Sequence, residues 1–137
     1  MLSRVPLLAL ACVLALAPAM TAAETSSIGY SSVAEALSSL RARPDVTIQI
    51  KAGWTIVDDR AHGILWSFTP PGHPAYPAAV KRILVTRDGG WYVDTRMLCE
   101  AEKEPCDKLA QDFYDLNDNM RRSIPHKHRS GGQPPPQ

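Results

Sequence analysis

The sequence has almost no net charge, and this excludes one broad class of partner. Lysine and arginine number 15 along the whole chain, and aspartate and glutamate number 14. If Arg4 is removed with an N-terminal leader, the two signs balance. Proteins that attract DNA or RNA through their electric field carry a surplus of basic residues on one face. We therefore expect no nucleic-acid partner.

The sequence also lacks the short motifs that identify catalytic and cofactor sites. It contains no G-x-S-x-G, no G-x-x-x-x-G-K-[ST] and no H-E-x-x-H. Asp58 and Asp59 are adjacent, so on a strand they point to opposite faces and do not form a carboxylate pair. These absences predict a non-enzymatic protein without catalytic residues, cofactor-binding residues, metal ligands or a cofactor.

Long apolar runs are scarce as well, and the clearest lies at the N-terminus. Arg4 precedes the run Val5–Ala17, which is typical of a secretory signal peptide and too short for a permanent membrane helix. Small side chains precede Glu24, so we predict a signal peptide over 1–23 with cleavage near Ala23. Lipidation at Cys12 is an alternative that the order of the apolar segments disfavours. The predicted location is periplasmic or secreted, without a permanent membrane span.

Cysteine is rare, and its positions indicate a disulfide. Of three cysteines, Cys99 and Cys106 remain after removal of the leader. A pair of cysteines in an exported chain normally oxidises, and closing this short loop would stabilise the fold by about 2.5 kcal/mol. Redox-active pairs usually have C-x-x-C spacing. We interpret the pair as a structural disulfide, with free or redox-active thiols as the alternative.

Hydrophobic periodicity predicts an α+β fold. Ser32 and Glu35 form a capping box, and the apolar residues that follow predict a helix from about Ser32 to Ala42. Pro105 in a first turn, with an apolar stripe that continues to Met120, predicts a C-terminal helix. Short runs of alternating or apolar residues predict a half-buried strand over 46–51 and further strands over 54–57, 64–69, 80–86 and 91–98.

The order αβββ-ββα indicates an antiparallel meander sheet of four to five strands with an N-terminal and a C-terminal helix. We expect both helices on one face of the sheet. Asp88-Gly89-Gly90 predicts a hairpin turn, and the four prolines within 70–77 predict a stiff crossing loop. The predicted organisation is a signal peptide (1–23), a flexible mature N-terminus (24–31), a single α+β domain (32–123) and a disordered Pro/Gly-rich tail (124–137).

Aromatic residues beside basic ones are the candidate binding surface, because such surfaces often contact partners. The three tryptophans would share one sheet face. Trp66 fits the core because Ile64 and Phe68 lie on its side of the strand, whereas we expect exposure of Trp54 or Trp91. The candidate residues are His73, Tyr76, Trp54, Trp91, Arg60, Lys81 and Arg82. An envelope protein or a glycan is the expected partner, and the oligomeric state stays open.

The segment Trp66–Arg82, WSFTPPGHPAYPAAVKR, resembles a segment in small exported proteobacterial proteins of unassigned function. The resemblance extends from about Ser32 to Met120 and includes Gly53-Trp54 and the later cysteine pair. It implies a small, secreted α+β domain. It implies no activity and no functional residue.

The leading hypothesis is a non-enzymatic binding or accessory protein of the cell envelope. A rival is a small hydrolase or metal-dependent enzyme using His73, which requires a concave pocket holding His73 and a second titratable group. Two further alternatives are a carrier of a small apolar ligand between sheet and helices and an inhibitor or immunity-type protein. A tryptophan that the C-terminal helix covers belongs to the core, whereas one on the sheet area that this helix leaves uncovered is available for contact.

Overall fold

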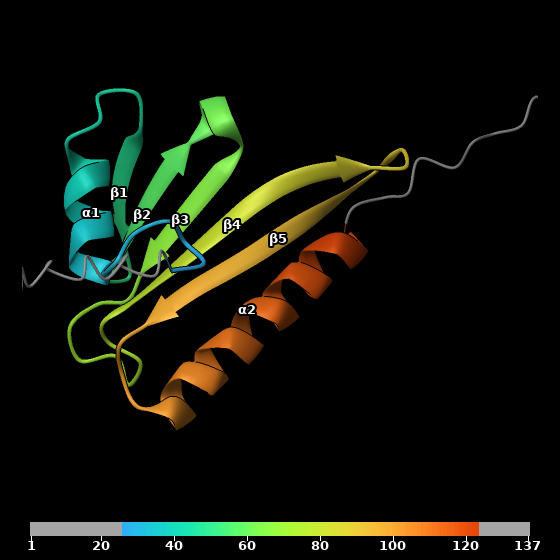
Figure 1. Ribbon diagram of the computed structural model, residues 1–137. Helices are drawn as coiled ribbons and strands as arrows, with labels where there is room; N and C mark the ends of the chain where they lie inside the picture. Colours follow the sequence, from blue (N-terminus) through green and yellow to red (C-terminus); the bar gives the residue numbers. More distant parts are fainter. Residues whose placement is uncertain (1–25, 124–137) are drawn as a thin grey trace, which may run out of the picture.

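A computed structural model of the chain describes residues 26–123 and confirms the α+β meander (Figure 1). Five antiparallel strands form one sheet in the order β1-β2-β3-β4-β5. The elements are α1 (Val33–Arg41), β1 (Thr47–Lys51), β2 (Trp54–Asp59), the 3-10 turn η1 (Arg60–His62), β3 (Ile64–Phe68), β4 (Ala78–Arg87), β5 (Gly90–Cys99) and α2 (Lys103–Ser123). The predictions for the signal peptide, Cys12 and the tail lie outside the described residues.

Two tight turns fix the register of the outer hairpins. Ala52 and Gly53 have φ angles of 49° and 83°, and Asp88 and Gly89 have φ angles of 51° and 74°. Two consecutive left-handed residues characterise the two-residue turn that matches the twist of paired strands. Lys51 therefore pairs with Trp54 across the first turn. The hairpin turn expected at Asp88 is confirmed.

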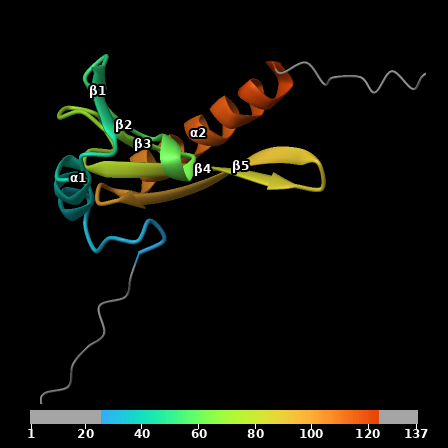
Figure 2. The same ribbon diagram turned by 90° about the horizontal axis from the view of Figure 1, so that it is seen from above.

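The two helices cover opposite faces of the sheet, so the expectation that they share one face is wrong (Figure 2). The core cluster under α1 contains Trp66 and Ala79. The cluster under α2 contains Ala78, Val80 and Phe113. Side chains alternate along a strand, so Ala79 points away from its two neighbours. The start of β4 is apolar on both faces, and each face needs its own cover.

Strand β1 is more exposed than the alternation of its sequence suggests. All five of its residues are exposed, and Ile48 and Ile50 are 38% and 65% exposed. β1 is an edge strand, and α1 packs over β4 near the middle of the sheet. The expected half-buried strand therefore forms in the right place, but no element of the described chain covers it.

The described part of the expected flexible N-terminus, residues 26–31, packs against the sheet. Ile28 is 1% exposed within the α1-side core. The Tyr30 ring centroid lies 5.8 Å from that of Trp66, and Lys81 Nζ donates to the Ile28 carbonyl at 3.4 Å. The apolar side chains of Ile28 and Tyr30 fill space beside Trp66, which orders this segment.

The start of α1 is held by local and distant caps. Ser32 Oγ accepts from the Glu35 amide at 3.1 Å, as the capping box predicts. The Glu35 carboxylate accepts from the Ser31 amide at 2.8 Å instead of from Ser32, and these Ser31 contacts lower the pKa of Glu35. Glu100, which follows β5, accepts from the Val33 amide at 2.7 Å. This last bond ties α1 to the end of the sheet.

A disulfide between Cys99 and Cys106 joins the end of β5 to the first turns of α2, with their Cα atoms 5.9 Å apart. The predicted pairing is confirmed. Pro105 lies in the first turn of α2, where its missing amide hydrogen leaves no helical bond unmade. Neither α1 nor α2 combines the length and the apolar character that a membrane crossing requires.

The proline-rich segment connects two neighbouring strands, β3 and β4, and does not cross the sheet. Its base is closed by Thr69, whose Oγ1 accepts from the Ala78 amide at 2.9 Å. Within it, the Tyr76 amide donates to the His73 carbonyl at 2.9 Å. The loop is therefore a compact connection at one end of the meander.

Candidate functional site

The three tryptophans do not share one face of the sheet. Trp66 belongs to the α1-side core and is 3% exposed, as expected. Trp54 lies on the α2 side, with its ring centroid 6.1 Å from that of Phe113. Trp91 is also on the α2 side and is 40% exposed. Trp91 is therefore the tryptophan available for contact.

A groove lies on the α2 side where the long hairpin outruns the rest of the sheet. β4 and β5 have 10 residues each, whereas β1, β2 and β3 have 5, 6 and 5, so the hairpin projects past them (Figure 1). The groove has a volume of about 500 Å³. We name it the hairpin groove; its apolar lining consists of Ile64, Leu65, Leu84, Trp91, Val93 and Met120.

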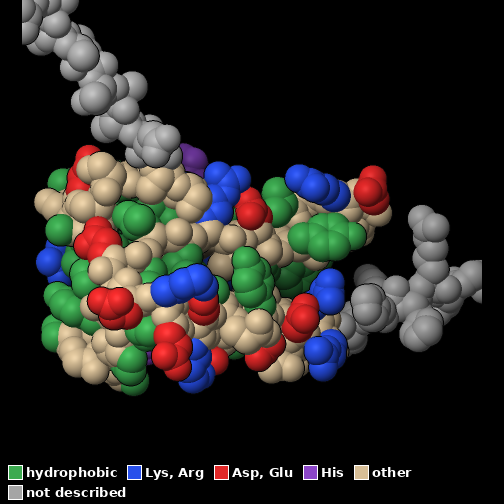
Figure 3. Space-filling model, turned by 60° about the horizontal axis from the view of Figure 1, so that its bottom comes forward, with side chains coloured by type: hydrophobic (Ala, Val, Ile, Leu, Met, Phe, Trp, Pro, Cys, Tyr) green, Lys and Arg blue, Asp and Glu red, His purple; other side chains and the backbone are tan. Residues whose placement is uncertain are grey.

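The walls of the hairpin groove expose an unusual amount of apolar surface. Leu84, Trp91 and Met120 are 54%, 40% and 42% exposed, and they come from three different elements. Figure 3 shows hydrophobic side chains gathered around a hollow at the end where the hairpin projects. Contiguous exposed apolar patches on a soluble domain typically mark binding sites.

Three charged residues also line the hairpin groove, and two of them neutralise each other. Arg60 Nε lies 2.8 Å from Asp58 Oδ2, and this contact raises the pKa of Arg60. Arg82 is the third. It forms no ion pair with a carboxylate of residues 26–123. The groove lining therefore carries one positive charge without a counterion from the described chain.

The Arg82 side chain is held between the sheet and α2. Its guanidinium carbon lies 5.4 Å from the centre of the Phe113 ring, and Nη1 lies 3.8 Å from Met120 Sδ. Nε is buried and has no hydrogen-bond partner among the described residues. Burial lowers the pKa of Arg82. This arginine is fixed in position but incompletely satisfied.

A smaller hollow of about 300 Å³ brings together His73, Trp54, Arg82 and Asp112. It thus meets the geometric condition for an enzyme using His73. However, His73 Nδ1 accepts from the Ala75 amide at 3.0 Å, and the Asp112 carboxylate is bound by Lys108 at 2.9 Å. In the described part of the chain, no hydrogen bond joins His73 to another titratable side chain. The hollow therefore holds no assembled acid–base pair.

The remaining candidate residues lie on other surfaces. Tyr76 is on the proline-rich loop and is 48% exposed. Lys81 points to the opposite face, with its Nζ 5.1 Å from the centre of the Trp66 ring. The structure thus brings Arg60, Arg82 and Trp91 together, and it leaves Tyr76 and Lys81 apart from them.

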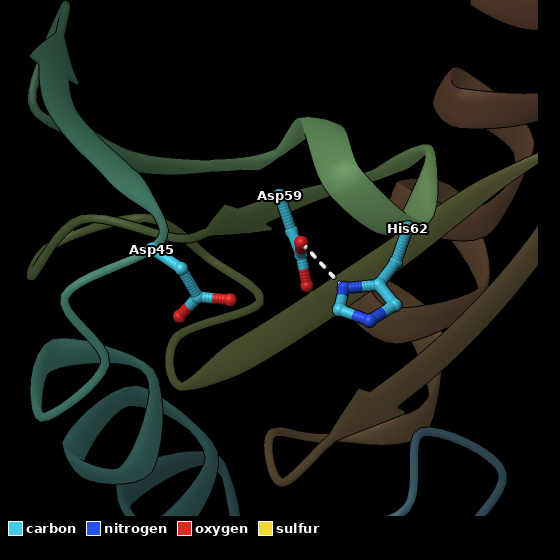
Figure 4. Close-up of side chains that lie close together, drawn as sticks. All are labelled: Asp45, Asp59 and His62. Atoms are coloured by element: carbon cyan, nitrogen blue, oxygen red, sulfur yellow. Dashed lines mark hydrogen bonds and ion pairs between the residues drawn. The ribbon is translucent and has the colours of Figure 1, made fainter.

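A second polar cluster, which the sequence analysis did not identify, combines Asp45, Asp59 and His62 (Figure 4). Their potential ligand atoms lie within 4.8 Å of one another. Asp59 is 1% exposed, and its Oδ1 lies 2.8 Å from His62 Nδ1. Asp59 and its strand neighbour Asp58 point to opposite faces, as expected.

Arg43 occupies the space between the two carboxylates of this cluster. Its Nη1 donates to Asp59 Oδ2 at 2.7 Å, and its Nε donates to Asp45 Oδ1 at 3.0 Å. Burial alone would raise the pKa of Asp59, but the hydrogen bonds from Arg43 and His62 lower it. The arginine already supplies the positive charge that a metal ion would bring. We therefore interpret the cluster as an ionic link between the end of α1 and β2.

The aliphatic and methionine residues of the hairpin groove were visible in the sequence only as members of predicted strands and of the predicted C-terminal helix. Met120 ends the apolar stripe of α2, and Leu84 and Val93 lie in predicted strands. A usable signal is the length of the last hairpin, because its apolar residues extend beyond the strands that could cover them.

Comparisons with known proteins identified no relative of this chain. No family model, no curated protein and no solved structure matched the chain.

Proposed function

We propose that this protein is a non-enzymatic binding protein of an oxidising, extracytoplasmic compartment, and that an elongated apolar ligand occupies the hairpin groove. The observation that carries the proposal is the exposure of Leu84, Trp91 and Met120 around one hollow. Water in contact with these side chains is released when an apolar ligand covers them, and this release favours binding.

The size and construction of the groove support a small ligand. Its volume of about 500 Å³ falls within the range of about 300–1,000 Å³ that small-molecule sites occupy. Leu84 and Val93 are paired across the hairpin, and Met120 faces them from α2. Regular secondary structure thus supplies the walls, which suits a preformed site. The exposed wall side chains leave the groove open to solvent, so that a flexible chain has access to it.

The proposed compartment follows from the cysteines and the N-terminus. The disulfide between Cys99 and Cys106 supports an oxidising environment. The signal peptide expected over 1–23 supports export to such an environment. A periplasmic or secreted location accommodates both features.

The groove replaces the proline-rich loop as the proposed contact. On that loop Tyr76 is exposed, whereas the Lys81 ammonium lies over Trp66 on the α1 side of the sheet. The exposed tryptophan and two arginines of the candidate set border the groove instead.

Binding of N-phenyl-1-naphthylamine, an uncharged apolar fluorophore, tests this proposal. We expect its fluorescence to rise on addition of the protein. Leu84→Glu would place a charge in the apolar wall and weaken binding by about tenfold or more. Ile50→Glu is the matched control, because Ile50 is also an exposed apolar strand residue, at 65%, but lies on β1. Absence of binding to the wild type, or equal loss in both variants, would contradict the proposal.

A further inference from the structure

Arg82 occupies a position in the sheet where its partners on both neighbouring strands are uncharged. It pairs with Leu65 on β3 and with Thr95 on β5. Phe113 and Met120 of α2 lie against its guanidinium. A partly desolvated cation between apolar groups is unfavourable unless an anion accompanies it.

The described chain supplies no such anion to Arg82. Asp58, which also lines the hairpin groove, is bound to Arg60. Asp112, which shares the smaller hollow with Arg82, is bound to Lys108. A buried donor atom, Arg82 Nε, lacks an acceptor in residues 26–123. Arg82 therefore brings one positive charge without a counterion from residues 26–123 to the lining of the hairpin groove.

We infer that the hairpin groove binds a single-chain amphiphile with one carboxylate, whose chain lies along Leu84, Trp91 and Met120 and whose carboxylate pairs with Arg82. This inference rests on the proposed function and adds the chemical class of the ligand. A planar guanidinium presents paired donors that match the two oxygens of a carboxylate. One unpaired cation matches one anionic charge, which favours a carboxylate over the more highly charged phosphate.

Other occupants fit the charge of the groove less well. The segment after α2, residues 124–137, contains Lys127 and Arg129 and no acidic residue. It would add positive charge beside Arg82. A second copy would bring the same hairpin groove, with the same unpaired arginine, so two such grooves would not neutralise each other.

Displacement of bound N-phenyl-1-naphthylamine by four amphiphiles with the same twelve-carbon chain tests the inference. The competitors are dodecanoate, dodecanol, dodecyl phosphate and dodecyltrimethylammonium, each below its micelle concentration. We expect dodecanoate to bind the wild type at least tenfold more tightly than dodecanol, because a charge-assisted hydrogen bond distinguishes them. Dodecyltrimethylammonium should bind more weakly than either.

Variants of Arg82 then assign the preference to this residue. Arg82→Gln should bind dodecanoate and dodecanol with equal affinity. Arg82→Lys should keep part of the preference, since it keeps the charge. Arg87→Gln is the matched control on the same strand, where the arginine is exposed and lies outside the groove lining, and it should leave the preference unchanged.

The outcomes separate the inference from the proposed function. If the wild type binds the fluorophore but does not prefer dodecanoate to dodecanol, the inference is overturned and the proposed function stands. Tighter binding of dodecyl phosphate than of dodecanoate would also overturn it. Absence of fluorophore binding would overturn both. If circular dichroism shows that Arg82→Gln is unfolded, the relative affinities of the wild type and of Arg82→Lys for dodecanoate and dodecanol still test the inference.

Discussion

The guanidinium of Arg82 lies 5.4 Å from the centre of the Phe113 ring, but it has no carboxylate partner within residues 26–123. A cation over an aromatic face gains about 0.5–2 kcal/mol, whereas a buried donor without an acceptor costs about 1–3 kcal/mol. Stability of the free protein therefore gives no reason to keep an arginine there. Residues that reduce stability in this way are often retained for binding.

We predict that Arg82→Met stabilises the free protein. Methionine fills a similar volume beside Phe113 and removes both the desolvated charge and the unsatisfied Nε donor. The expected gain is about 1 kcal/mol, or a rise of about 4–8 °C in Tm for a domain of this size. Thermal and urea unfolding of the purified protein measure it. The exposed residue Arg87, changed to methionine, should shift Tm little; a loss of stability in Arg82→Met would refute the account of Arg82.

We predict that Asp59→Asn destabilises the fold strongly at pH 7. Asp59 is 1% exposed and receives hydrogen bonds from Arg43 and His62. The variant removes the charge that accepts these hydrogen bonds, and a hydrogen bond to a charged group contributes about 1.5–3 kcal/mol. Asp58→Asn is the control, because its partner Arg60 is 87% exposed and exposed pairs contribute about 0–1 kcal/mol. Equal effects of the two variants would contradict the assignment of Asp59.

The same carboxylate should make stability depend on acidity. The pKa of Asp59 is lower in the folded protein than in the unfolded chain. Its contribution is thus fully present above the ordinary aspartate pKa of about 3.9 and is lost as the pH falls through the lower folded value. We expect the stability difference between wild type and Asp59→Asn to shrink from pH 5 to pH 2. Urea unfolding at several pH values measures it; a constant difference would exclude this linkage.

We predict that removal of the disulfide lowers stability without altering the fold. The bridge closes a short loop, and the entropy model gives about 2.5 kcal/mol for a loop of this length. The double variant Cys99→Ser, Cys106→Ser should lose that amount, and a reductant should lower the stability of the wild type alone. When the native protein is alkylated without prior reduction, mass spectrometry should find Cys99 and Cys106 unalkylated, because a disulfide protects them. Free thiols in the exported protein would contradict the proposed compartment.

Local signals in the sequence were sufficient for most of the fold. The turn at Asp88-Gly89 has the left-handed geometry that its residues favour, and the Ser32 hydroxyl caps α1 as its position indicates. These features depend on residues that are close together along the chain. Strand and helix positions therefore follow from periodicity and turn chemistry alone.

Features that depend on the arrangement of whole elements were not predictable in this way. Ile48 and Ile50 alternate as in a half-buried strand, but no helix or strand within residues 26–123 covers β1 on that face. Nothing local states on which side of the sheet a helix docks, so the positions of α1 and α2 on opposite faces required the structure. The one local sign that both faces of the sheet are covered is the pair of neighbouring apolar residues on β4, such as Ala79 and Val80, which point to opposite faces.

The candidate site shows the same division. Arg60, Arg82 and Trp91 were identified from the sequence because exposed aromatic and basic residues suit binding, and they do line one groove. Leu84 and Met120 were not identified as candidates, because an apolar residue in a regular element gives no local sign of exposure. Arg43 and Asp59 meet across 16 positions of sequence, and no motif spans that distance.

The most direct test of the central claim is an NMR titration of the isotopically labelled protein with dodecanoate. The account predicts that backbone amide shifts concentrate at Leu84 and Val93, together with the Trp91 indole N–H, and that they saturate with one ligand per chain. Shifts confined to the proline-rich loop at 70–77, or none at the hairpin groove, would contradict it.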